Sequence, residues 1–335
     1  MNTTVTLNNG VKMPVFGLGT FLSAGNDCYN AVEAAIKHGY RLIDTACAYR
    51  NHKQVGAAIK KCIDEGVVKR EDLFITTKLW VCDYKPEDVE AAIKVSLEDL
   101  GLEYVDLVLI HQAGLFDLPP EVDKRRHEGY FFDYEVLPGE DCHKIGFDLE
   151  KVMGAWKKLE ELYQRGWIRA LGVSNYSSKR LQMVYDRATI KPAINQVELH
   201  PYLQQWEHKA VCDKLGVYMM AYFPLGGAKV YHSAKYGTPM EDPVILRIAE
   251  EHKKTPAQVM IRWAVQRGTI CIPKSVHTNR VIENAGIFDF KLTEKEMEEI
   301  RGLDKRCRFA SPSFLFPDPT NENMWNNEYC ELSVF

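Results

Sequence analysis

Eight short apolar runs, each predicted to be a β-strand, constrain the fold of this chain more than any other feature. They cover residues 16–19, 41–44, 73–78, 105–111, 168–174, 193–198, 218–222 and 269–273. Segments with helical periodicity lie between them; one begins at Pro86 and continues through Val89, Ile93, Leu97 and Leu100. Strand and helix therefore alternate along the whole chain.

This alternation predicts a (β/α)8 barrel, an α/β TIM-barrel fold. The strands are too apolar to face water, which is typical of parallel strands covered by helices, and eight repeats suit a closed barrel better than an open sheet. An open, doubly wound sheet is the alternative. A β-hairpin is expected around Asn9-Gly10, ahead of the first barrel strand.

Two segments interrupt the alternation of strands and helices. Residues 112–147 separate the fourth strand from its helix and are rich in Pro, Gly, acids and aromatics, so we expect a lid-like loop at the substrate entrance. Residues 304–335 form an irregular tail with Phe309, Phe314, Phe316 and Trp325, which we expect to fold back over an apolar part of the barrel mouth. No linker is evident, so residues 1–335 are predicted to form one domain.

Composition argues against nucleic acid and membranes as partners. The formal net charge of −4 provides no overall basic field for nucleic acid or an anionic membrane, and no apolar run is long enough to span a bilayer. The amino terminus lacks a secretory signal, and the nine scattered cysteines are typical of reduced thiols, so a cytoplasmic location is expected. The spacing of histidines and acids matches no metal-site motif.

Four polar residues follow or end three consecutive strand-like runs: Asp44, Tyr49, Lys78 and His111. The carboxyl end of the strands carries the active site in barrel enzymes, so these side chains are candidates for proton transfer. A lysine ammonium beside a tyrosine is expected to move the phenol pKa from about 10 toward neutral values, with Asp44 fixing Lys78. Each residue alone could instead be a cap, a solvated charge or a packed side chain, but their joint placement favours a site.

Several local sequences resemble the aldo-keto reductase family, over nearly the whole chain. They are Gly39-Tyr-Arg-Leu-Ile-Asp-Thr-Ala46 followed by Tyr49 and Asn51, Thr77-Lys-Leu-Trp80, Leu109-Ile-His111, Gly172-Val-Ser-Asn175, Asn195-Gln-Val-Glu-Leu-His-Pro-Tyr202, Ala221-Tyr-Phe-Pro-Leu-Gly226 and Ile272-Pro-Lys-Ser-Val276 with Arg280, Glu283 and Asn284. The resemblance implies an eight-stranded barrel that transfers hydride between a nicotinamide cofactor and an aldehyde or ketone.

The resemblance also implies roles for individual residues. Tyr49 would protonate the nascent alkoxide, Lys78 and Asp44 would tune it, and His111 would orient the carbonyl. The implied cofactor contacts are Gly19, Thr20, Asp44, Ser174, Asn175, Gln196, Tyr222, Leu225, Lys274, Ser275, Arg280, Glu283 and Asn284. The cations Lys274 and Arg280 could form charge-assisted bonds with a 2′-phosphate but not with a bare ribose hydroxyl, so NADPH is predicted over NADH.

Departures from the family pattern bear on cofactor and substrate. His52 replaces an acid, Phe223 replaces the serine after the stacking tyrosine, and Lys229 lies where an acid often clasps the cofactor. Phe21 replaces a tryptophan and Gln112 a second one, while Trp80 is kept, so the substrate pocket is expected to be more polar than usual. Such a pocket is expected to bind hydroxylated aldehydes or sugars better than purely hydrophobic aldehydes.

Two other functions remain open at this stage. Lys78 could act as a Schiff-base nucleophile in a lyase, because a desolvated lysine can lose its proton near neutral pH. The barrel could also serve mainly as an NADPH-binding sensor or structural subunit. The physiological substrate and direction of flux are not evident from the sequence, and a monomer is expected only by analogy with many family members.

Overall fold

The computed structural model of the chain describes residues 4–121, 142–227, 236–310, 315–318, 320–326 and 331–332. Eight parallel strands form its centre, in the spatial order β12-β11-β10-β9-β6-β5-β4-β3. They are β3 Gly17–Gly19, β4 Leu42–Asp44, β5 Phe74–Leu79, β6 Leu107–Ile110, β9 Leu171–Ser174, β10 Ile194–Glu198, β11 Tyr218–Tyr222 and β12 Ile270–Cys271. Each lies within or overlaps one of the predicted runs.

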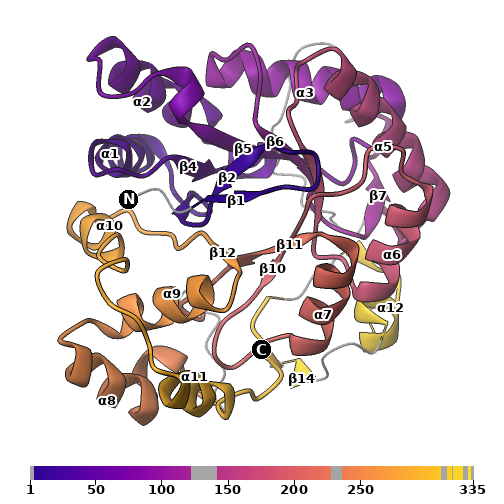
Figure 1. Cartoon of the computed structure of the whole chain (residues 1–335). Coiled ribbons are helices and arrows are strands. Elements are labelled where there is room, and N and C mark those ends of the chain that lie inside the picture. The colour runs from indigo at the N-terminus through magenta and orange to yellow at the C-terminus, as the bar shows by residue number, and fades with distance from the viewer. Residues whose placement is uncertain are drawn as a thin grey trace.

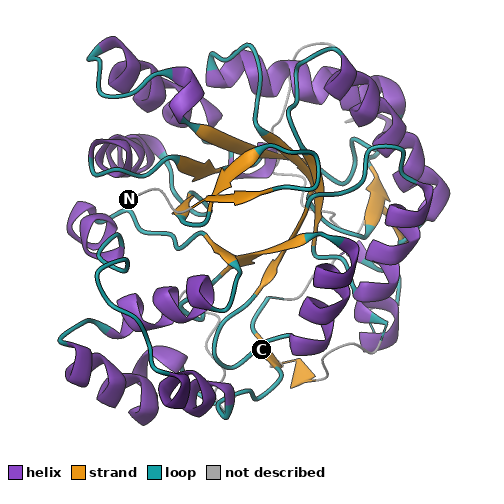
Figure 2. Cartoon of the chain, viewed as in Figure 1, coloured by secondary structure: helices purple, strands orange, loops and turns teal. Residues whose placement is uncertain are grey.

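The sheet closes on itself. Parallel bridges join Phe16 to Cys271 and Gly19 to Lys274, so the first and last strands adjoin. The expected (β/α)8 TIM barrel is therefore confirmed, and the open sheet is wrong. Figures 1 and 2 show the ring of strands with helices around it.

Helices between the strands form the outer layer. They are α1 Gly25–Lys37, α2 His52–Asp64, α3 Pro86–Leu100, α5 Leu149–Gln164, α6 Ser178–Arg187, α7 Trp206–Leu215, α8 Pro243–His252, α9 Pro256–Gln266, α10 Thr278–Asn284 and α11 Glu294–Arg301. Local sequence explains their ends: α3 starts with Pro86 and two acids and stops at Gly101, whose φ of 65° suits glycine. No helix in the described part of the chain has the length and apolar character needed to cross a membrane.

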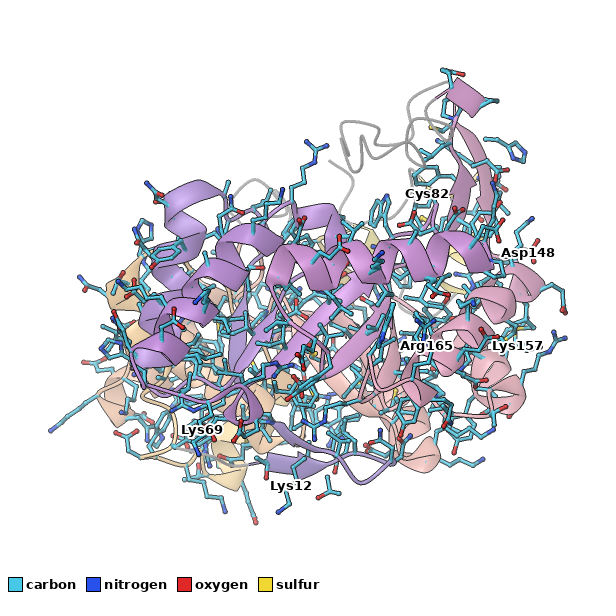
Figure 3. The ribbon with its side chains drawn as sticks, turned by 90° about the horizontal axis from the view of Figure 1, so that it is seen from above. Lys12, Lys69, Cys82, Asp148, Lys157 and Arg165 are labelled. Carbon is cyan, nitrogen blue, oxygen red and sulfur yellow. The ribbon has the colours of Figure 1, made fainter. Side chains whose placement is uncertain are left out.

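The predicted hairpin is present as β1 Thr4–Thr6 and β2 Lys12–Pro14. Its Leu7 and Met13 are buried and belong to the same apolar cluster as barrel residues such as Leu42, Phe74 and Met220. Side chains therefore fill the barrel at the amino ends of its strands. Figure 3 shows Lys12 at this end and Cys82, which follows β5, toward the other.

The two irregular segments are partly described. In the predicted lid, β7 Leu115–Asp117 and β8 His143–Gly146 form an antiparallel ribbon, an element that the composition did not predict; residues 122–141 lie outside the described residues. In the tail, Phe309, Phe316 and Trp325 are buried as expected, in a segment that includes β13 Cys307–Arg308, α12 Asn321–Trp325 and β14 Glu331–Leu332. Phe314 lies outside the described residues.

Hydrogen bonds connect the tail to loops that follow barrel strands. Both oxygens of buried Glu198, the last residue of β10, accept backbone N–H groups, from Phe309 at 2.7 Å and Ala310 at 2.8 Å. The Ser177 hydroxyl, after β9, donates to Asn326 at 2.6 Å. The tail thus packs at the strand carboxyl end, the same end as the candidate site.

Candidate active site

The four predicted catalytic residues, here called the tetrad, meet at the carboxyl end of three neighbouring strands. Asp44 ends β4, Lys78 lies near the end of β5, and His111 follows β6, while Tyr49 ends a short 3₁₀ helix, Cys47–Tyr49, after β4. Strands β4, β5 and β6 are adjacent in the barrel. The topology therefore brings together side chains that are up to 67 positions apart.

Lys78 is the centre of this group. Its ammonium donates to Asp44 Oδ1 at 2.5 Å, to the Thr45 carbonyl at 3.0 Å and to the Tyr49 hydroxyl at 3.1 Å. The Lys78 side chain is fully buried. Burial lowers the pKa of Lys78 and raises that of Asp44, and their contact opposes both shifts.

Burial raises the pKa of the Tyr49 phenol well above 10, and the charge of Asp44 adds to the rise. The expected shift toward neutral pH is therefore wrong for this structure. The reason is that Asp44 neutralises much of the Lys78 charge, so desolvation of the phenolate dominates. Tyr49 consequently stays protonated at neutral pH, as an acid must before it donates.

His111 completes the group. Its ring lies 5.6 Å from the Tyr49 ring and 5.0 Å from the Trp80 ring, measured between centroids. Burial and the nearby Lys78 charge hold its pKa well below 6.5, so the imidazole is neutral and carries one N–H donor. Its Nδ1 atom is buried without a hydrogen-bond partner among the described residues.

Four of the implied cofactor residues, Ser174, Asn175, Gln196 and Tyr222, form a hydrogen-bonded amide cluster beside the tetrad. The Tyr222 hydroxyl donates to Asn175 Oδ1 at 2.8 Å, and the Asn175 amide donates to Ser174 Oγ at 3.1 Å. The Gln196 amide donates to Asp44 Oδ2 at 2.7 Å. The two groups are therefore one network.

The remaining implied cofactor residues differ in burial. Thr20 donates through its hydroxyl to the Asp44 carbonyl at 2.9 Å, and a Cβ on Gly19 would lie 2.9 Å from the Ile272 carbonyl oxygen. Lys274 and Arg280 are exposed and form no ion pair within the described chain. Ser275 and Asn284 are buried, Leu225 is half-buried and Glu283 is exposed.

These residues fit a phosphorylated dinucleotide. The buried amides and hydroxyls suit a carboxamide at one end, and in the described chain the Oε1 of Gln196 accepts no hydrogen bond. Two unpaired cations at the other end suit phosphate oxygens. Lys229, the residue expected to alter cofactor closure, lies outside the described residues.

The predicted substrate residues surround the tetrad. Phe21 packs against Tyr49 with ring centroids 5.2 Å apart, and Trp80 contacts His111. Gln112 is half-buried, and its Oε1 atom has no hydrogen-bond partner in the described structure. Phe21 and Trp80 therefore contact the catalytic group, whereas Gln112 is next to His111 in the sequence and its place in the pocket stays a prediction.

Sequence reasoning gave no role in the site to two residues that support it, Asn51 and His52. Asn51 accepts from the Thr45 hydroxyl at 2.7 Å and donates to the carbonyls of Thr20 and Ser23, so it ties the loop after β3 to the loop after β4. Buried His52 contacts the Thr77 hydroxyl at 3.0 Å, next to Lys78. An amide two positions after Tyr49 is the signal that could have revealed Asn51.

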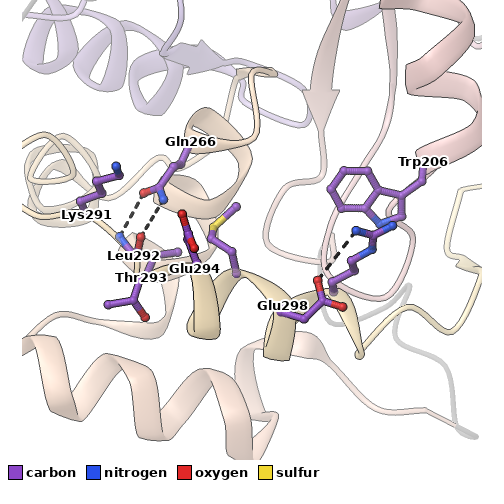
Figure 4. A pocket seen from close by; sticks show the side chains of 9 residues that line it. Trp206, Gln266, Lys291, Leu292, Thr293, Glu294 and Glu298 are labelled. Atoms are coloured by element: carbon purple, nitrogen blue, oxygen red, sulfur yellow. Dashed lines mark hydrogen bonds and ion pairs between the residues drawn. The ribbon is translucent and has the colours of Figure 1, made fainter.

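A separate hollow of about 410 Å³ lies between α7, α9 and α11. Its lining includes Trp206, Gln266, Met297 and Arg301, and the Gln266 side chain is engaged by both backbone groups of Leu292 (Figure 4). None of the tetrad lines it. The described residues contain no group of three or more His, Cys, Asp or Glu side chains that could hold a metal.

Comparisons with known proteins identify relatives of this chain. The sequence model of the Aldo/keto reductase family matches residues 16–305. Aldo-keto reductase family 1 member A1 of Gallus gallus is 39% identical over 92% of this chain and 90% of its own length, and the Homo sapiens protein of that name is 38% identical over 92% and 91%.

A solved structure is similar too. The crystal structure of MGS-M4, an aldo-keto reductase enzyme from a Medee basin deep-sea metagenome library, has a TM-score of 0.75 and 36% identity, covering 90% of this chain and 95% of that chain. The family uses NADH or NADPH, and its reductases act on carbonyl compounds. This chain belongs to the aldo/keto reductase family.

Proposed function

We propose that the protein reduces aldehydes to alcohols with NADPH, using Tyr49 as the general acid. The observation that carries the proposal is the position of the Lys78 ammonium, 3.1 Å from the Tyr49 hydroxyl and 2.5 Å from Asp44. When bound, NADPH supplies the hydride that goes to the carbonyl carbon. Tyr49 gives its proton to the carbonyl oxygen, and the Lys78 ammonium stabilises the phenolate that this leaves.

The other residues prepare this transfer. Neutral His111 offers an N–H group to the carbonyl oxygen and so orients it toward Tyr49. Asp44 keeps Lys78 charged and in place, and the Gln196 amide fixes the second oxygen of Asp44. The phenolate regains its proton from water, which completes the cycle.

NADPH is proposed over NADH because of Lys274 and Arg280. Both are exposed cations near the end of β12, and neither is committed to an ion pair within the described residues. A 2′-phosphate can accept charge-assisted hydrogen bonds from them, whereas a ribose hydroxyl gains little.

Small hydroxylated aldehydes are the proposed substrates. The buried Oε1 of Gln112 has no partner in the described structure, and an unsatisfied buried acceptor costs about 1–3 kcal/mol. A hydroxyl beside the substrate carbonyl can donate to it. Replacing Gln112 with leucine should therefore remove most of the preference for glyceraldehyde over propanal, and equal efficiency of the unmodified protein on these two aldehydes would contradict the assignment.

The lyase alternative is disfavoured by geometry. A Schiff base requires a free lone pair on Lys78, but all three ammonium N–H groups donate, to Asp44, Thr45 and Tyr49. Borohydride trapping of a substrate on Lys78 would reverse this conclusion.

The test is consumption of NADPH with glyceraldehyde, run beside NADH at equal concentration. We expect turnover with NADPH and a lower kcat/KM with NADH. NADPH binding without turnover over a broad panel of aldehydes would instead favour the sensor or structural role.

A further inference from the structure

Two departures from the family pattern that are distant in sequence meet in space. Phe21 follows β3 and Phe223 follows β11, and their ring centroids lie 6.1 Å apart with the ring planes inclined at 48°. Aromatic pairs at this separation attract each other beyond simple burial. Both side chains are half-buried, so the pair borders solvent.

The pair spans the carboxyl end of β12. That strand pairs with β11 on one side, and just beyond its end Lys274 bridges to Gly19 of β3 on the other. Phe21 and Phe223 therefore come from the two neighbours of β12 and contact each other across it. Lys274 and Arg280 follow β12, while Phe21 contacts Tyr49 and Phe223 contacts Tyr222 at 5.3 Å on the side of the tetrad and amide cluster.

The backbone is shaped to hold the rings in this position. Phe223 has a φ of 49° and Leu22, next to Phe21, a φ of 54°, both in the left-handed region that non-glycine residues rarely occupy. The Phe223 carbonyl accepts the Gly226 N–H at 2.9 Å. Gly227 leaves room for the ring, since a Cβ there would lie 3.1 Å from it. Such strain persists only where the surrounding structure supports it, and it concentrates at functional sites.

We propose that Phe21 and Phe223 form an aromatic gate through which the dinucleotide enters and leaves. The inference rests on the proposed function, which places one end of NADPH at Lys274 and Arg280 and the other at the amide cluster. A molecule that connects these ends passes the Phe21–Phe223 contact and must part the rings. Because the ring contact is apolar, its opening is insensitive to salt.

The test measures the rates of NADPH association and release, from the change in NADPH fluorescence after rapid mixing or chase. Phe223→Ala removes the contact with Phe21 along with the contact with Tyr222; loss of the Phe21 contact should speed both rates by about five- to tenfold, and Kd should stay within about threefold. Phe223→Leu, a milder change at the strained backbone, should act in the same direction. Phe21→Leu combined with Phe223→Ala should add no more than about twofold, because the two rings form one contact.

Two controls separate the gate from other effects. Phe290→Leu, which removes an aromatic contact with His252 remote from the tetrad, should change neither rate. Raising salt from about 0.05 to about 0.5 M should preserve the ratio of Phe223→Ala to unmodified rates, while the ratio for Arg280→Ala shrinks.

The outcomes are distinct. Faster release with unchanged association would make Phe223 a simple contact residue and overturn the gate, as would two unchanged rates. Failure of the unmodified protein to bind NADPH would instead overturn the proposed function.

Discussion

Two buried polar sites, Asp106 at the amino end of the barrel and His111 at the carboxyl end, differ in how their atoms are paired. At the amino end, the carboxylate of buried Asp106 is saturated: it accepts from Arg70 at 2.8 Å, from Arg169 at 2.8 Å and from the Ile75 backbone N–H at 2.9 Å. At the carboxyl end, His111 Nδ1 and Gln112 Oε1 are buried without hydrogen-bond partners among the described residues.

Backbone strain is also found at the carboxyl end, in the loops that follow the strands. Leu22, Asn175 and Phe223, each in a loop that follows a barrel strand, have φ values of 54°, 61° and 49°. The amino end is filled by Leu7 and Met13 of the hairpin, in ordinary apolar packing. The comparison teaches that the paired Asp106 carboxylate and the apolar hairpin belong to the folded framework, whereas the unpartnered His111 and Gln112 atoms and the strained loops lie at the end where a ligand is expected.

The largest expected effect tests the carboxyl end. Tyr49→Phe removes the transferable proton but keeps the ring that packs against Phe21. Glyceraldehyde reduction should fall by about 100- to 10,000-fold, the range that general acid catalysis contributes. NADPH affinity, measured by fluorescence, should stay within about twofold. A variant that keeps more than a tenth of the original kcat would refute Tyr49 as the acid.

The next effect tests the amino end. Met13→Ala opens a cavity under the hairpin, where Met13 is fully buried, and should lower the free energy of unfolding in urea by about 3 kcal/mol. The kcat/KM should stay within about twofold. The matched control is Lys12→Ala on the same strand, an exposed change expected to cost under about 0.5 kcal/mol. A loss of activity that exceeds the loss of folded protein would show that the two ends are coupled.

The barrel was predictable because its signals are local and repeated. Each of the eight strands is an apolar run bounded by turns, and strand-end positions of Asp44, Lys78 and His111 follow from those boundaries. Tyr49 was predicted from its place just after the run that ends at Asp44, although it lies on a short 3₁₀ helix and not on the strand itself; its role as the acid came from the family resemblance.

Other features depended on three-dimensional context. The Tyr49 pKa was predicted in the wrong direction because the sequence shows a neighbouring cation but not the depth of burial or how closely Asp44 neutralises it. The contact between Phe21 and Phe223 is equally invisible in sequence, since it depends on barrel closure between β3 and β12. The ribbon β7–β8 pairs residues on either side of a long insertion, which no local pattern reports.

A smaller effect, on cofactor affinity, is expected for the exposed cations at the same end as the buried tetrad. Arg280→Ala should weaken NADPH binding by about 1.5–3 kcal/mol and leave NADH binding nearly unchanged, because only the 2′-phosphate forms the charge-assisted bond. Calorimetric titration with each cofactor measures this. Arg301→Ala, an exposed arginine on α11, serves as the control. Equal losses for both cofactors would remove the 2′-phosphate assignment.

The smallest effect concerns His52, which contacts Thr77 next to the tetrad but belongs to the folded framework. Burial, with a contribution from Lys78, lowers its pKa from 6.5 to about 4. Below pH 6.5 the unfolded chain therefore binds a proton at His52 that the folded chain does not, so stability falls as pH drops from 6.5 toward 4. His52→Gln keeps a polar group near Thr77 and cannot titrate.

Between about pH 7 and about pH 5.5, urea unfolding of His52→Gln should show a loss of stability smaller by about 1 kcal/mol than that of the unmodified protein. If His52→Gln instead alters the pH profile of kcat while the stability slope stays the same, His52 acts through Lys78 on the reaction. Helix α2 would then belong in part to the site, because its first residue, His52, would change the ionisation of the catalytic lysine.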